Sequence, residues 1–159
     1  MIALSHFASA QLNDIFDKIY FGGGFGFDFN QNISSFNLTP YAGYKLTEYW
    51  SAGLGLNYQF WQDKILDLKI NNYGGNVFVR YKITSQIFVS AKLEYLSVDF
   101  INNREGFYNL PVGVGYVLPI SRIASLYMIG QYDLLYDVND TNGAYSSPWI
   151  LEAGFGFGF

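Results

Sequence analysis

The sequence predicts an all-β fold: a closed antiparallel up-and-down eight-stranded transmembrane β-barrel. Three observations support this fold class. Half of the residues are hydrophobic and 20% are aromatic, whereas only 14% are charged, yet no run of 18 apolar residues could form a membrane helix. From Ile19 onward the residue types alternate with the period of two that is typical of strands. The connections between the alternating blocks are by turns short and long.

Eight alternating blocks follow one another, each long enough to cross a bilayer as a tilted strand. The first and last alternate glycine with phenylalanine, and those between alternate mainly Leu, Val and Tyr with Gly, Asn and charged residues. The blocks are approximately 19–30, 36–46, 50–61, 70–83, 87–98, 107–118, 123–136 and 148–159. Short connections at 47–49, 84–86 and 119–122 are assigned to a periplasmic rim, and longer polar ones at 31–35, 62–69, 99–106 and 137–147 to the opposite rim.

One face of this predicted sheet is bulky and uncharged, and the other carries glycine and charge. Phe25, Leu54, Val77 and Tyr95 belong to the bulky face, whereas 12 of the 17 glycines belong to the other. The interior of an eight-stranded barrel is only wide enough for side chains to fill it. The aromatic face is therefore expected outside, where lipid would cover it. A lipocalin or a soluble sandwich, with the opposite arrangement, is the alternative.

Residues 1–10 end in Ala8-Ser9-Ala10, the small-x-small pattern that signal peptidase recognises. They are interpreted as the remnant of an export signal peptide, which would place the mature chain outside the cytoplasm. Residues 11–159, beginning at Gln11, are then a single outer-membrane β-barrel domain. A basic start and a longer apolar stretch are missing, so a short buried segment is the alternative.

Charged side chains on the interior face form the main candidate site, with four cations and four anions. They are Asp28, Lys45, Arg80, Lys82, Lys92, Glu94, Asp133 and Glu152. Closing the barrel sets a basic wall at 70–83 and 87–98 across from an acidic wall at the two ends of the chain, and buried charges persist only when they are paired. The charges are interpreted as a salt-bridged plug that fixes the barrel. The alternative is a gated narrow pore in which the same pairs form the gate.

The residue types needed for most catalytic and metal chemistry are missing. The chain has no cysteine, and its one histidine, His6, falls in the predicted signal peptide. A Ser-His or Cys-His nucleophile cannot be assembled, and zinc or copper lose their usual ligands. The net charge is −4 with no basic run, so the sequence has no nucleic-acid footprint. We expect no enzyme activity, no cofactor, no metal site and no nucleic-acid partner.

The last nine residues, 151–159, end in Phe159 with Phe157 and Phe155 at alternate positions before it. This ending resembles the C-terminal signature that the barrel assembly machinery recognises in bacterial outer-membrane barrels. The chain from Gln11 is similar to the small eight-stranded superfamily that contains the OmpA membrane domain and OmpX, and its Asn- and Tyr-rich style resembles a Bacteroidota member. The resemblance implies a location in the bacterial outer membrane. It also implies lipid, lipopolysaccharide and the assembly machinery as partners.

As to function, we expect a non-enzymatic outer-membrane protein with a structural or interaction role, such as an accessory subunit of an envelope complex. The alternative is a narrow channel for small or hydrophobic solutes. Conductance in planar bilayers separates the two.

Overall fold

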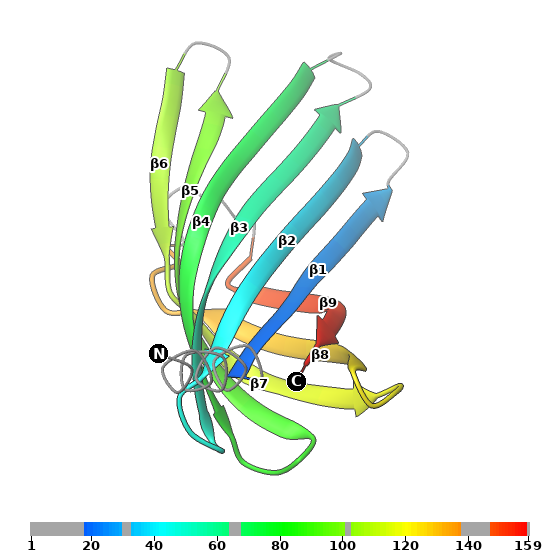
Figure 1. Cartoon of the computed structure of the whole chain (residues 1–159). Helices are drawn as coiled ribbons and strands as arrows, with labels where there is room; N and C mark the ends of the chain where they lie inside the picture. Colours follow the sequence, from blue (N-terminus) through cyan, green and yellow to red (C-terminus); the bar gives the residue numbers. More distant parts are fainter. Residues whose placement is uncertain (1–17, 30–32, 64–67, 101–102, 138–146, 159) are drawn as a thin grey trace, which may run out of the picture.

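A computed structural model describes residues 18–29, 33–63, 68–100, 103–137 and 147–158, which form strands joined by turns (Figure 1). Seven of the predicted blocks become single strands, and the sixth becomes two. The strands are β1 (Ile19–Phe29), β2 (Ile33–Lys45), β3 (Trp50–Asp63), β4 (Leu68–Lys82), β5 (Ile87–Phe100), β6 (Asn103–Asn109), β7 (Pro111–Pro119), β8 (Ala124–Asp133) and β9 (Trp149–Phe157). The described residues include no helix that is long and apolar enough to cross a membrane.

Antiparallel pairing closes the sheet into a ring of eight strands, which confirms the predicted fold class. Hydrogen-bonded neighbours run in the order β4-β3-β2-β1-β9-β8-β7-β5, and the pairing of β4 with β5 completes the ring. The further strand β6 pairs with β5 beyond the point where β7 begins. A closed ring leaves few strand edges without a partner.

β6 and β7 are one strand interrupted at Leu110 and Pro111, whereas the sequence predicted a continuous strand over 107–118. The register with β5 is the same on both sides of the interruption, so no residue is inserted. Proline has no amide hydrogen to donate to the ladder. The carboxylate of Asp133 accepts the amide of Leu110 at 2.8 Å and holds the backbone at this point. β6 also begins within the predicted loop at 99–106.

The strands on the two sides of the barrel differ in length. β2 to β5 have 13 to 15 residues, whereas β7 to β9 have 9 or 10. The seam between β1 and β9 has four paired positions, from Phe21 opposite Phe157 to Gly24 opposite Gly154. Beyond the seam, β1 to β6 continue upward as a curved wall, while β7 to β9 cross below them (Figure 1). The ring is therefore closed in the half that carries the short turns.

The three short turns share one design. In each turn a hydroxyl, from Thr47, Thr84 or Ser121, accepts hydrogen bonds from the amides two and three residues further on. An aliphatic residue, 54% to 58% exposed, precedes each hydroxyl residue. These aliphatic residues are Leu46, Ile83 and Ile120. Hydroxyl bonds of this kind favour a tight turn, so the same local chemistry occurs in all three turns at this end of the barrel.

The predicted outer face is exposed in the structure. Phe21, Leu54, Val77 and Leu151 are apolar and yet 50% to 77% exposed. The interior holds a feature that the sequence reading left unassigned, because five aromatic side chains are buried there and form most of the apolar core. They are Tyr20, Tyr41, Phe78, Phe88 and Tyr127.

Each of these interior rings lies opposite a glycine of the neighbouring strand. Gly43 pairs with Tyr20 and Gly115 with Phe88, and a Cβ atom at either glycine would overlap the ring. The other three pairs follow the same rule: Gly22 with Tyr41, Gly53 with Phe78 and Gly154 with Tyr127. The interior glycines thus provide the space that the aromatic core occupies.

Replacing Gly43 by alanine should destabilise the barrel by about 1–3 kcal/mol, the usual range for overpacking a core, because the new methyl group overlaps the ring of Tyr20. Gly130→Ala is the matched control, since no described atom lies within 4 Å of its Cβ position. Urea midpoints of both variants refolded into lipid vesicles measure the difference. A wild-type urea midpoint for Gly43→Ala would mean that the ring of Tyr20 moves aside, and would contradict a tightly packed core.

Candidate functional site in the barrel lumen

The lumen is filled by two layers of side chains, and the layer nearer the short turns is an aromatic cage around Arg80. The guanidinium carbon lies 4.5 Å from the ring centroids of Tyr41 and Phe78, 5.2 Å from Phe88 and 5.6 Å from Tyr127. Tyr41 packs edge-to-face against Phe78 with centroids 5.4 Å apart. A guanidinium within about 6 Å of an aromatic face is attracted to the ring electrons, and more strongly where water is excluded. Arg80 is 8% exposed, so the cage holds a buried cation.

The second layer is a cluster of charges centred on Lys92. Its Nζ atom lies 3.1 Å from a carboxylate oxygen of Glu94 and 3.7 Å from one of Glu152. Asn109 donates a hydrogen bond to Glu94 at 3.4 Å, and Tyr127 donates one to Glu152 at 2.8 Å. Because the Glu94 side chain is 1% exposed and that of Lys92 is 10% exposed, the pair depends on its own contacts for stabilisation rather than on water.

The two layers are connected and leave little space between them. Tyr127 belongs to both, since its ring faces Arg80 and its hydroxyl binds Glu152. Arg80, Lys92 and Glu152 together line a remaining cavity of about 20 Å³, which is room for about one water molecule. A second cavity of about 70 Å³ lies near Glu152 and Gly24. Two cations and two carboxylates, Arg80 and Lys92 with Glu94 and Glu152, thus share one packed core.

The structure brings four of the eight predicted charges into this core and sets two others apart. Lys92, Glu94 and Glu152 form the ion-pair cluster, and Arg80 lies beside it. The sequence predicts that Arg80 lies across the lumen from carboxylates, and in the structure four aromatic rings lie around its guanidinium. Lys45 and Lys82 line the mouth of the barrel at the turn end.

Of the remaining two predicted charges, the structure describes the side chain of one. Asp133 is 2% exposed, and its Oδ1 atom accepts the amides of Leu110 at 2.8 Å and Leu135 at 3.1 Å. Its described bonds therefore hold backbone at the strand interruption. The side chain of Asp28 lies outside the described residues.

Two of the three phenylalanines in the predicted assembly signal lie on the outer face. Phe155 and Phe157 are 41% and 52% exposed. Phe155 stacks on Phe25 of β1 with centroids 5.7 Å apart, so it also helps to close the seam. Phe159 and residues 1–10, the predicted signal remnant, lie outside the described residues.

Below the aromatic cage the barrel opens at its turn end into a cavity of about 400 Å³, which we call the vestibule. Its charged lining residues are Lys45, Glu48, Arg80, Lys82 and Arg122. Hydroxyl residues of all three turns complete the lining. Among the described residues, no group of three or more His, Cys, Asp or Glu side chains is arranged to hold a metal ion.

Replacing Lys92 by methionine should lower the free energy of unfolding by about 3–5 kcal/mol, because it leaves two buried carboxylates without their cation. Arg104→Gln is the control. It breaks the Arg104–Asp99 pair, whose side chains are 33% and 46% exposed, and should cost about 0–1 kcal/mol. Urea unfolding of both variants provides the comparison. Equally small losses would show that water screens Lys92, which would favour the pore interpretation.

The chain was compared with protein families, with curated proteins and with solved structures. No protein-family model and no curated protein match the chain. Among solved structures it is similar to a designed protein described as "Solution NMR structure of de novo designed TMB2.3", with 15% identity over 87% of this chain and 90% of that one, at a TM-score of 0.43. At this TM-score the likeness adds nothing to the fold that the strand pairing already establishes.

Proposed function

We propose that the chain is a membrane-spanning barrel of a bacterial outer membrane, with a plugged lumen and a structural or interaction role rather than a catalytic one. The packed core of Arg80, the aromatic cage and the Lys92 cluster is the observation that carries this proposal. A lumen filled in this way favours a plug over a pore.

The arrangement of the outer face supports insertion into a bilayer. Aliphatic side chains such as Leu54 and Val77 lie between two levels of aromatic pairs on neighbouring strands. Near the turns, Trp50 pairs with Tyr81, and eight residues further along β3, Tyr58 pairs with Tyr73. Two further aromatic pairs lie toward the strand ends away from the short turns, Tyr95 with Tyr108 and Tyr132 with Trp149. Eight residues of a tilted strand span roughly 20 Å, close to the apolar band of membrane barrels, which aromatic girdles flank.

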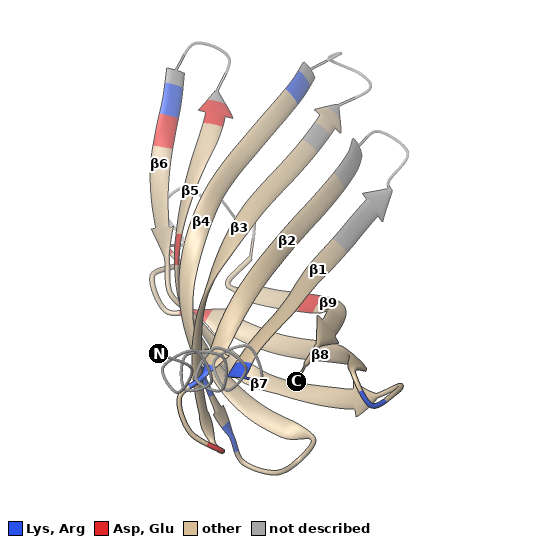
Figure 2. Ribbon diagram, in the orientation of Figure 1, with Lys and Arg blue, Asp and Glu red and all other residues tan. Residues whose placement is uncertain are grey.

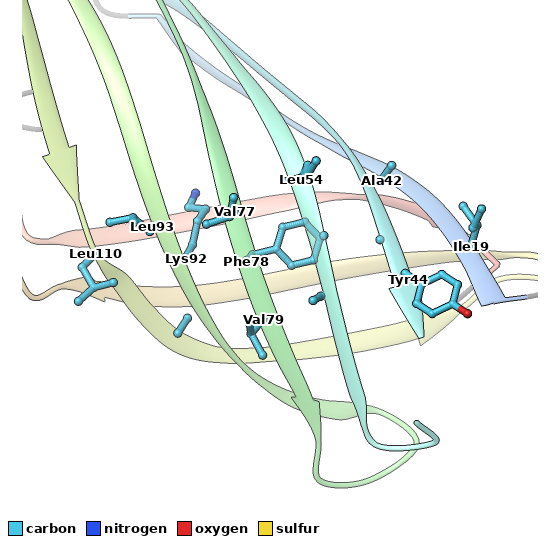
Figure 3. A pocket seen from close by; sticks show the side chains of 14 residues that line it. Ile19, Ala42, Tyr44, Leu54, Val77, Phe78, Val79, Lys92, Leu93 and Leu110 are labelled. Atoms are coloured by element: carbon cyan, nitrogen blue, oxygen red, sulfur yellow. The ribbon is translucent and has the colours of Figure 1, made fainter. Parts of the chain in front are cut away.

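A shallow groove of about 740 Å³ interrupts this apolar face. Leu54, Val77 and Leu93, from three successive strands, line it (Figure 3). The short side chains of Ala42, Ala52 and Ala91 also belong to the lining. Lipid acyl chains would cover a groove of this shape and chemistry. In water, the same groove would be part of a large contiguous apolar surface, which soluble proteins rarely expose.

The distribution of charge agrees with the same membrane position. Charged residues lie at the far ends of β4 to β6 and around the short turns (Figure 2). Between these two levels, the charged residues Lys92, Glu94 and Glu152 belong to the core of the lumen. At the far end, Arg104 forms an ion pair with Asp99 and packs over the ring of Tyr73 at 4.1 Å. We therefore place the long wall of β1 to β6 partly outside the bilayer, on the side opposite the short turns.

The sequence supports specific partners and an origin for this barrel. Alternate aromatic residues at 155, 157 and 159 support recognition by the barrel assembly machinery, and the exposed apolar face supports contact with outer-membrane lipid and lipopolysaccharide. The relation to the OmpA and OmpX superfamily, a Bacteroidota origin and cleavage before Gln11 belong to the same proposal.

An arginine at Leu54 should destabilise the inserted barrel by about 2–4 kcal/mol, because this 65% exposed side chain would lie near the bilayer midplane. The same substitution at Ser85, in a short turn, should change the unfolding free energy by less than about 1 kcal/mol. Folding titrations in vesicles measure both. Equal effects at the two positions would contradict the proposed membrane band.

In planar bilayers the wild-type protein should show no steady single-channel current, because the Arg80 cage and the Lys92 cluster fill the lumen. Phe88→Ala removes one wall of the cage and should produce brief openings that the wild type lacks. A stable conductance of the wild-type protein would overturn the plug and favour the narrow channel.

A further inference from the structure

The vestibule is a cavity that the packed side chains of the core leave open. It opens at the turn end, and its lining contains Arg80 together with the cage residue Phe88 and the core residue Tyr20. The cage therefore lies at its inner end, where Phe88 and Arg80 line the cavity. Its volume of about 400 Å³ lies within the range of small-molecule sites.

Strand register explains why basic side chains converge there. Lys45 pairs with Ser51, and Ser51 pairs with Arg80, so these residues lie on one rung that crosses three strands. Lys82 follows Arg80 by two residues and therefore faces the same side of the sheet. Arg122 adds a fourth cation from the third turn. Basic residues gather at this end in Figure 2.

The charge of the lining is strongly unbalanced. Lys45, Arg80, Lys82 and Arg122 carry four positive charges, and Glu48 supplies one negative charge. Thr47, Thr84 and Ser121 have their side-chain oxygens occupied as acceptors for turn amides, so their hydroxyl hydrogens remain able to donate. Cations and hydroxyl donors around one cavity are the groups that bind phosphate oxygens.

We propose that the vestibule binds a phosphate monoester attached to an aromatic or apolar body. The phosphate would lie among Lys45, Lys82 and Arg122 near the mouth, and the apolar body would pack against Phe88 and the cage. The ester comes either from a soluble molecule or from a lipid headgroup, since both present the same phosphate to the cavity.

Isothermal titration of the full chain in maltoside micelles tests the soluble source, with phenyl phosphate as the probe and phenol as its uncharged match. Wild type should bind phenyl phosphate and not phenol. The double variant Lys45→Gln/Lys82→Gln should weaken binding by about tenfold or more, because it removes two charge-assisted contacts. Lys69→Gln/Arg104→Gln, which removes two cations from the opposite end, is the matched control and should bind as wild type.

The lipid source is tested in nanodiscs by the thermal midpoint, with phosphatidic acid compared with phosphatidylcholine. Stabilisation by phosphatidic acid that disappears in Lys45→Gln/Lys82→Gln, without phenyl phosphate binding, would assign the lipid source. Absence of both effects in wild type overturns the proposal. Equal losses in the two double variants also overturn it, because they would show attraction to net charge alone. Both assays are independent of conductance, so a conducting barrel would reject the plug without deciding this site.

Discussion

The inside of an eight-stranded ring has room for side chains and little else, and this limit on volume determines much of the structure. Bulky residues such as Leu54 and Val77 lie outside the ring. Each of the five aromatic rings of the apolar core lies opposite a glycine, as Tyr20 does opposite Gly43. Charges held inside are far from bulk water and must find partners in the same small space, which Lys92 does with two carboxylates.

Alternation along the sequence predicted which side chains face into or out of the barrel, but not which side chains meet across the lumen. The phase of Val77 and Val79 gave the outer face, and the same phase turns Phe78 inward between them, so the aromatic core was within reach of sequence reasoning. Pro111 within a predicted strand was a similar signal for the interruption. The cage around Arg80 was not predictable in this way, because alternation assigns a side chain to a face, whereas its neighbours across the lumen depend on the stagger of the closed strands.

The core and the vestibule divide the interior by chemistry. In the core, the two cations Arg80 and Lys92 balance the carboxylates of Glu94 and Glu152, whereas cations outnumber carboxylates in the vestibule. Arg80 belongs to both regions, since it lines the vestibule and is surrounded by the rings that close it. A plugged barrel of this kind presents two distinct surfaces. One is the far end of the long strands, where Arg104 and Asp99 lie, and the other is the basic vestibule at the turn end. An interaction role would use these surfaces rather than the lumen.

The seam between β1 and β9 joins the two ends of the chain through only four paired positions, most of them glycine on at least one strand. This pairing is the most distant in sequence of all the ladders, and such contacts carry the largest loop-closure cost during folding. Glycine demands no matching side chain from the facing strand, so these positions pair through backbone alone. Joining the two ends of the chain therefore costs the most chain entropy of any ladder in the ring, and it does so through the fewest paired positions.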